Sequence, residues 1–160
     1  MIIILQIVLI LTLSIIFVQD LKDRHVSLFL LLFGILAGGL LHFYQQNNIV
    51  FLSNILINVI FVVLIFFVLW GYAKLKLRKA IFEVFGIGDL LFFTLLAVSL
   101  PILSFLVIFV ASLIFSLTIF LVLKNTLIKK TVPLAGFQAL FFSLVLIGNE
   151  ISDSIDLYAM

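Results

Sequence analysis

The amino-acid sequence predicts an all-α, polytopic membrane protein with six transmembrane helices and both termini on the outer side of the membrane. Of its 160 residues, 66% are hydrophobic and only 10% are charged, whereas soluble domains are about a quarter charged. The mean hydropathy is +1.52. The apolar runs are continuous and do not alternate with polar residues, which favours helices over a β-barrel. We expect residues 1–160 to form a single membrane-embedded domain.

Polar segments divide the first half of the sequence into three predicted spans, each at least as long as the roughly 17 residues that a membrane crossing needs. The first span, residues 2–19, ends at the polar sequence DLKDRH. The second span, residues 28–44, ends at the neutral polar sequence QQNN. The third span, residues 49–72, precedes a basic cluster made of Lys74, Lys76, Arg78 and Lys79.

The second half contains an apolar run from residue 80 to residue 123, with Glu83 and Asp89 as its only charges. This run is too long for one span. Pro101 is the natural break, because proline cannot donate a backbone hydrogen bond to a continuing helix. The three spans predicted in this half are residues 84–100, 102–123 and 132–148.

Small and polar residues inside the spans predict contacts between helices. Gly34 and Gly38 are four residues apart, a spacing that allows close helix packing. We expect Asn54 and Asn58 to form interhelical hydrogen bonds. Gln138 either does the same or lines a cavity.

Lysine and arginine orient the predicted spans, because short loops rich in these residues stay in the cytoplasm. The loops at 20–27, 73–80 and 124–131 contain two, four and three of them, and the loop at 45–48 contains none. We therefore expect the three basic loops to be cytoplasmic in a multi-pass protein of the cell membrane. We interpret these residues as orientation signals and not as a nucleic-acid site. The loop at 73–80 is also placed to meet anionic lipid headgroups.

Two acids are expected at the cytoplasmic side of the membrane. No ionisable residue follows Asp89 before residue 124, and an acid beside hydrocarbon is costly enough to indicate a function. Asp89 should lie about five residues, or roughly 8 Å, into the fourth span from the face at which Asp20 ends the first span. The two carboxylates would then lie at similar depth. Gly86 and Gly88, just before Asp89, would let another backbone approach closely.

Two neighbouring carboxylates can hydrolyse a peptide bond without a metal or a cofactor. Because both cannot ionise cheaply side by side, we expect the pair to share a proton near neutral pH. The ionised member can take a proton from water while the protonated member polarises a peptide carbonyl. The chain has no cysteine and two histidines, His25 and His42, which argues against a metal site. A proton-coupled transporter and a catalytically inactive membrane assembly factor remain as alternatives.

Three stretches resemble motifs of one protein family. Residues 86–89, with the sequence Gly-Ile-Gly-Asp, match the GxGD motif of membrane aspartyl proteases. The sequence DLKDRHVS at 20–27 resembles the first motif of the type IV prepilin peptidases. The sequence KTVPLAG at 130–136 is similar to the family's proline-containing entry to the last span.

The resemblance implies a membrane aspartyl endopeptidase that removes the basic leader from prepilin-like precursors, such as pilins and pseudopilins, at the cytoplasmic face. It implies that Asp20 and Asp89 form the catalytic pair and that no cofactor is needed. Some members also methylate the new N-terminus with an extra domain that is often held by cysteines. Because this sequence has no cysteine, we expect peptidase activity without a methyltransferase domain.

The sequence departs from the family's pattern at two places. Ser27 stands where the family usually has proline, and Leu90 and Leu91 stand where a lysine commonly follows the GxGD motif. The nearby basic residues that could supply this positive charge or contact the substrate are Lys22, Arg24 and His25.

Two further acids lie close to these motifs. We expect Asp23 to be a solvated charge. Glu83 is either a solvated loop acid or a residue that attracts a basic leader peptide.

Overall fold

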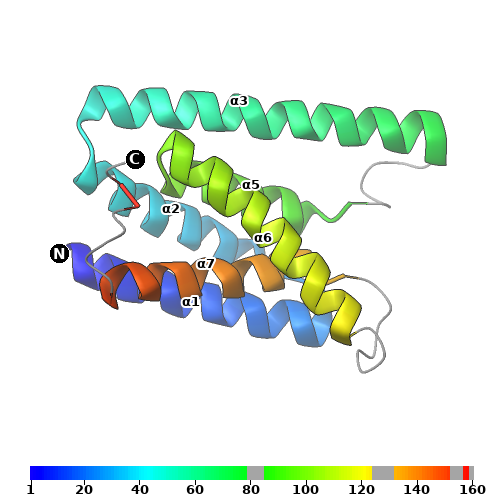
Figure 1. Ribbon diagram of the computed structural model, residues 1–160, viewed down its shortest axis with the longest axis horizontal. Helices are drawn as coiled ribbons and strands as arrows, with labels where there is room; N and C mark the ends of the chain where they lie inside the picture. The colour runs from blue at the N-terminus through cyan, green and yellow to red at the C-terminus, as the bar shows by residue number, and fades with distance from the viewer. Residues whose placement is uncertain (79–84, 124–131, 152–156, 159–160) are drawn as a thin grey trace.

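The computed structural model describes residues 1–78, 85–123, 132–151 and 157–158, and all regular structure within them is helical (Figure 1). This confirms the all-α prediction. The helices are α1 (Ile2–Asp23), α2 (Leu28–Gln45), α3 (Asn48–Tyr72), α5 (Ile87–Ser99), α6 (Ile102–Leu123) and α7 (Leu134–Ile151), and a π-helical turn, η1 (Ala73–Leu77), continues α3.

Five helices in the described part of the chain are long and apolar enough to cross a membrane: α1, α2, α3 together with η1, α6 and α7. This agrees with the prediction of a polytopic membrane protein. The remaining helix, α5, has 13 residues and is about 20 Å long, whereas the hydrocarbon core of a bilayer is about 30 Å thick.

The start of α5 differs from the span predicted over residues 84–100. Gly86 has an extended backbone, with φ −70° and ψ 142°, and forms the N-cap of α5. The helix therefore begins at Ile87 and ends at Ser99, just before Pro101. Asp89 is the third residue of this helix and not about the fifth residue of a longer span, as the sequence had suggested.

Helix α5 occupies the centre of the described bundle and packs against α2, α3, α6 and α7. Its side chains Phe92, Leu95 and Leu96 are fully buried. Figure 1 shows α3 along one edge of the bundle and α1 with α7 along the other. The position of Asp89 therefore depends on the contacts that fix α5.

Polar side chains from α2 and α3 hold the C-terminal end of α5. Its last carbonyl groups have no partner within the helix, because Pro101 cannot continue it. Asn58 donates to the carbonyl oxygens of Ala97 and Leu100 at 3.0 and 2.9 Å, and Nδ1 of His42 lies 2.9 Å from the carbonyl oxygen of Val98. These contacts confirm the interhelical role predicted for Asn58.

Glycines on α2 allow α5 to approach closely, as their spacing predicted. A Cβ atom at Gly34 would lie 2.6 Å from Cδ1 of Leu95. A Cβ atom at Gly38 would lie 1.9 Å from Oγ and 2.9 Å from Cβ of Ser99. At Gly34 the side chain of Leu95 could rotate away, whereas at Gly38 the contact with Cβ of Ser99 could be relieved only by moving one helix away from the other.

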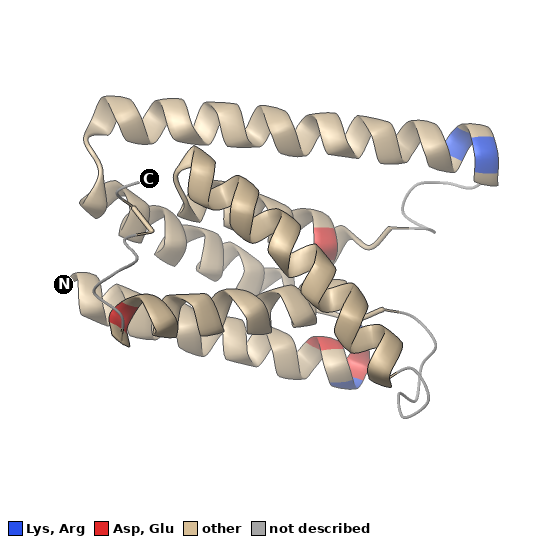
Figure 2. Ribbon diagram, in the orientation of Figure 1, with Lys and Arg blue, Asp and Glu red and all other residues tan. Residues whose placement is uncertain are grey.

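The charged residues divide between the two ends of the bundle. Figure 2 shows the described lysines and arginines at one end, near the aspartates of α1 and α5. The N-terminus lies at the other end (Figure 1), where Gln6 donates to Oε1 of Glu150 at 2.6 Å. The described basic residues thus share one end, and which end faces the cytoplasm stays a prediction. The basic residues outside the described part of the chain are Lys79, Lys124, Lys129 and Lys130.

Replacing Gly38 by alanine should destabilise the protein by about 1–3 kcal/mol, because the added methyl group overpacks the contact with Ser99. Thermal unfolding in detergent measures the effect. Gly71→Ala on α3 is the matched control, because a Cβ atom there has no neighbour within 4 Å. Equal stabilities of the two variants would contradict the close α2–α5 contact.

Candidate active site

The first turn of α7 provides backbone N–H groups that the helix itself cannot bind. The first backbone hydrogen bond of α7 runs from the N–H of Phe137 to the carbonyl oxygen of Pro133, at 3.0 Å. The three residues between them lie at the helix N-terminus, where N–H groups lack intrahelical acceptors and the helix dipole favours negative charge. Two of these N–H groups meet a carboxylate.

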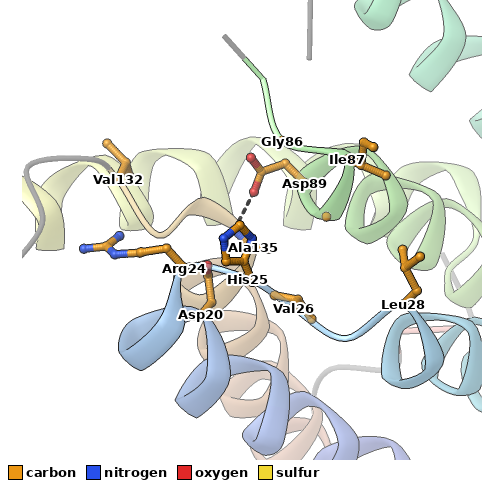
Figure 3. Close-up of a pocket in the computed structure, with 11 residues that line it drawn as sticks. Asp20, Arg24, His25, Val26, Leu28, Gly86, Ile87, Asp89, Val132 and Ala135 are labelled. Atoms are coloured by element: carbon orange, nitrogen blue, oxygen red, sulfur yellow. Dashed lines mark hydrogen bonds between the residues drawn. The ribbon is translucent and has the colours of Figure 1, made fainter. Parts of the chain in front are cut away.

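Asp20 and Asp89 each accept a hydrogen bond from this turn. The N–H of Gly136 donates to Oδ2 of Asp20 at 2.7 Å. The N–H of Ala135 donates to Oδ1 of Asp89 at 3.0 Å, the dashed line in Figure 3. Because the two donors are neighbours in the sequence, they bring together carboxylates from α1 and α5 that are 69 residues apart, at positions 20 and 89. The two acids are close enough to interact electrostatically.

Asp20 is held at the C-terminal end of α1. Its residue is only 7% exposed. The N–H of Arg24 donates to the carbonyl oxygen of Asp20 at 3.2 Å, and Arg24 caps α1 in the left-handed conformation, with φ 58°. The helix therefore ends just after Asp20, and the chain turns toward α2.

Asp89 is held at the N-terminal end of α5. The N–H groups of Asp89 and Leu90 donate to the carbonyl oxygen of Gly86 at 3.2 and 3.4 Å. A Cβ atom at Gly86 would lie 3.2 Å from Oδ2 of Asp89, so the absence of a side chain leaves room for this carboxylate. At Gly88 a Cβ atom would make an ordinary contact, 3.9 Å from Cβ of Val26. Of the two motif glycines, Gly86 is therefore the one at which an added side chain would crowd Asp89.

Both carboxylates line one cavity of about 450 Å³. Figure 3 shows side chains from the end of α1, the start of α5 and the entry to α7 around it. A cavity of this size falls in the range of small-molecule sites, and this one combines two carboxyl groups with an apolar wall. Its other lining residues are Arg24, His25, Val26, Leu28, Gly86, Ile87, Gly88, Val132 and Ala135.

The residues that the sequence suggested as supports for the two aspartates differ in whether they line the cavity. Arg24 lines the cavity, whereas Lys22 is exposed and does not. Gln138 is fully buried away from the cavity and donates to Oγ of Ser112 on α6 at 3.1 Å. Glu83 lies outside the described residues. No group of three or more potential metal ligands occurs among the residues that the structure describes.

Sequence reasoning did not identify Ala135 and Gly136 as site residues. They act through backbone N–H groups, which every residue except proline has. The available signal was Pro133 at the entry to the last predicted span, followed by two small residues at 135 and 136. Proline is favoured at helix starts, where the first amides have no acceptor within the helix, and small residues allow close approach.

Asp89→Asn should fold with a thermal stability at least equal to that of the wild type, because it removes the electrostatic repulsion between two neighbouring acids while keeping an oxygen for the Ala135 amide. A gain of about 1 kcal/mol would raise the melting temperature by about 2–4 °C. Thermal unfolding in detergent near neutral pH measures it. A clear loss of stability would mean that the carboxylate has a structural role.

Comparison with protein families gives an independent finding. A model of the type IV leader peptidase family matches residues 7–123. No curated protein and no solved structure matches the chain. The matched segment contains both aspartates and ends before α7, so the amides that hold them lie outside it. Because the match covers more than half of the chain and agrees with the resemblance of its two aspartate motifs, the chain belongs to the type IV leader peptidase family.

Proposed function

We propose that this protein is an aspartyl endopeptidase that removes the leader peptide from prepilin-like precursors at the cytoplasmic face of the cell membrane, with Asp20 and Asp89 as its catalytic pair. The observation that carries the proposal is the meeting of these two carboxylates on adjacent amides of α7, at the wall of one cavity. Membership of the type IV leader peptidase family supports a peptidase.

The chemistry needs one ionised and one protonated carboxyl group. The ionised member takes a proton from water as the water oxygen attacks the peptide carbonyl carbon. The protonated member donates a hydrogen bond to the carbonyl oxygen and stabilises its developing negative charge. The proton then passes to the peptide nitrogen as the C–N bond breaks. Each α7 amide binds one oxygen of its carboxylate, Oδ2 of Asp20 and Oδ1 of Asp89.

The position of the pair suits a membrane-bound precursor. The described lysines and arginines lie at the same end of the bundle as the two aspartates (Figure 2), and such residues favour the cytoplasmic side. A precursor with an apolar segment in the membrane and a leader in the cytoplasm presents the bond between them at this level. The apolar members of the cavity wall, such as Val26, Leu28 and Ile87, would contact the side chains next to that bond.

Asp20→Asn and Asp89→Asn should each lower the rate of leader removal by at least about a hundredfold, because each removes one partner of the acid–base pair. The assay mixes purified protein in detergent with a prepilin-like precursor and follows the shortened product by mass. Asp23→Asn is the matched control, because Asp23 is an exposed acid three residues from Asp20 that does not line the cavity. It should cleave at the wild-type rate.

Each contrary result has a distinct meaning. Wild-type activity in either the Asp20 or the Asp89 variant would exclude that residue from the catalytic pair. Failure of the wild-type protein on several cognate precursors would favour a catalytically inactive assembly factor. A proton-gradient-driven flux that needs Asp89 but not Asp20 would favour a transporter.

A further inference from the structure

Gly136 faces α1 and not the cavity. It is buried and is absent from the cavity lining, although its neighbour Ala135 belongs to that lining. A Cβ atom at Gly136 would lie 2.9 Å from Cβ, 3.0 Å from Oδ2 and 3.4 Å from Cγ of Asp20. Asp20 therefore occupies the volume that any other side chain at position 136 would need.

The packing of α1 against α7 makes this contact difficult to relieve. The Cβ atom of Asp20 is bonded to the α1 backbone, so it cannot move aside as the end of a long side chain could. Leu9, Leu13 and Ile16 of α1 are fully buried, and the rings of Phe17 and Phe137 lie 6.5 Å apart beside the site. Adding a methyl group at 136 would thus separate Asp20 from the Gly136 amide.

The Gly136 amide also affects the charge of Asp20. A hydrogen bond from an N–H group favours the ionised form of a carboxyl group. Burial has the largest effect on Asp20 and favours its protonated form, whereas Arg24 and His25, which line the same cavity, favour the ionised form as the amide does. The described groups that act on Asp89 are Asp20 and the backbone amides of Ala135 and Gly86, and no positively charged residue is among them.

We propose that Gly136 is a positioning residue: its missing side chain lets α7 donate its amide to Asp20 and keeps Asp20 as the ionised member of the pair, which leaves the proton on Asp89. Asp20 is then the group that takes the proton from water, and Asp89 is the group that donates to the peptide carbonyl. The expected kinetic effects of this assignment rest on the proposed function. The effect of Gly136 on the charge of Asp20 is independent of that function.

Gly136→Ala should lower kcat for leader removal by at least about tenfold, because a hydrogen bond to a charged group is lost. KM should stay within about twofold of the wild type, because Gly136 does not line the cavity and the loss falls on the chemical step. Gly148→Ala is the matched control on the same helix, since a Cβ atom there has no neighbour within 4 Å. It should leave both constants unchanged.

An infrared titration of carboxyl-labelled aspartates provides a readout that does not need activity. Subtraction of the spectrum of Asp20→Asn identifies the signal of Asp20. In Gly136→Ala, the pH at which Asp20 takes up its proton should rise by about one unit, because the amide no longer favours the ionised form. Gly148→Ala should titrate like the wild type. An unchanged Asp20 titration in Gly136→Ala would overturn the inference.

A second variant covers the case in which Gly136→Ala does not fold. Replacing Gly136 by glycolic acid converts its N–H to an ester oxygen, which removes the donor and adds no side chain. The pH at which Asp20 takes up its proton should again rise. A value equal to that of the wild type would overturn the inference. A wild-type protein that cleaves no precursor, together with a shifted titration in these variants, would refute the proposed peptidase and leave the role of Gly136 intact.

Discussion

The two hydrogen bonds from the first turn of α7 to Asp20 and Asp89 hold together three helices that are far apart in the sequence. Each acid alone lies at a helix end that water could reach. Together they bind adjacent amides, and the positive end of the α7 dipole offsets part of their mutual repulsion. The same turn thus holds the two carboxyl groups beside each other and stabilises negative charge on them, so that stability and the proposed chemistry depend on one local structure.

At the C-terminal end of α5, polar side chains likewise bind backbone groups in an apolar environment. Asn58 and His42 bind carbonyl groups that the proline break leaves without helical partners. In a membrane these carbonyls cannot rely on water. Helix α5 is therefore held by polar contacts at both ends and by close glycine packing against α2 along its length. These contacts fix the position of the short helix α5, and with it the position of Asp89 in the bundle.

The sequence allowed the fold class and the proximity of Asp20 and Asp89 to be predicted, because charge is conspicuous in a chain that is only 10% charged. The basic loops placed the two acids on one side. The length of α5 could not be predicted from the sequence, because apolar residues continue from residue 84 with no clear boundary. The start of the helix depends instead on the extended backbone of Gly86. Nor could the sequence identify Ala135 and Gly136 as donors, since an amide becomes specific only when the tertiary structure brings a carboxylate to it. Gln138, the polar residue conspicuous in the last span, instead pairs with Ser112.

The difference in length between α3 and α5 has a consequence for the access of water to Asp89. With η1, the α3 segment has 30 residues and is about 45 Å long, so it exceeds the hydrocarbon thickness of about 30 Å, whereas α5 is shorter than that thickness by about 10 Å. Because α5 is packed against four other helices, this missing length falls inside the bundle and not beside lipid. The cavity lined by Asp20 and Asp89 lies at the N-terminal end of α5, so water would enter the depth that a full-length span would fill.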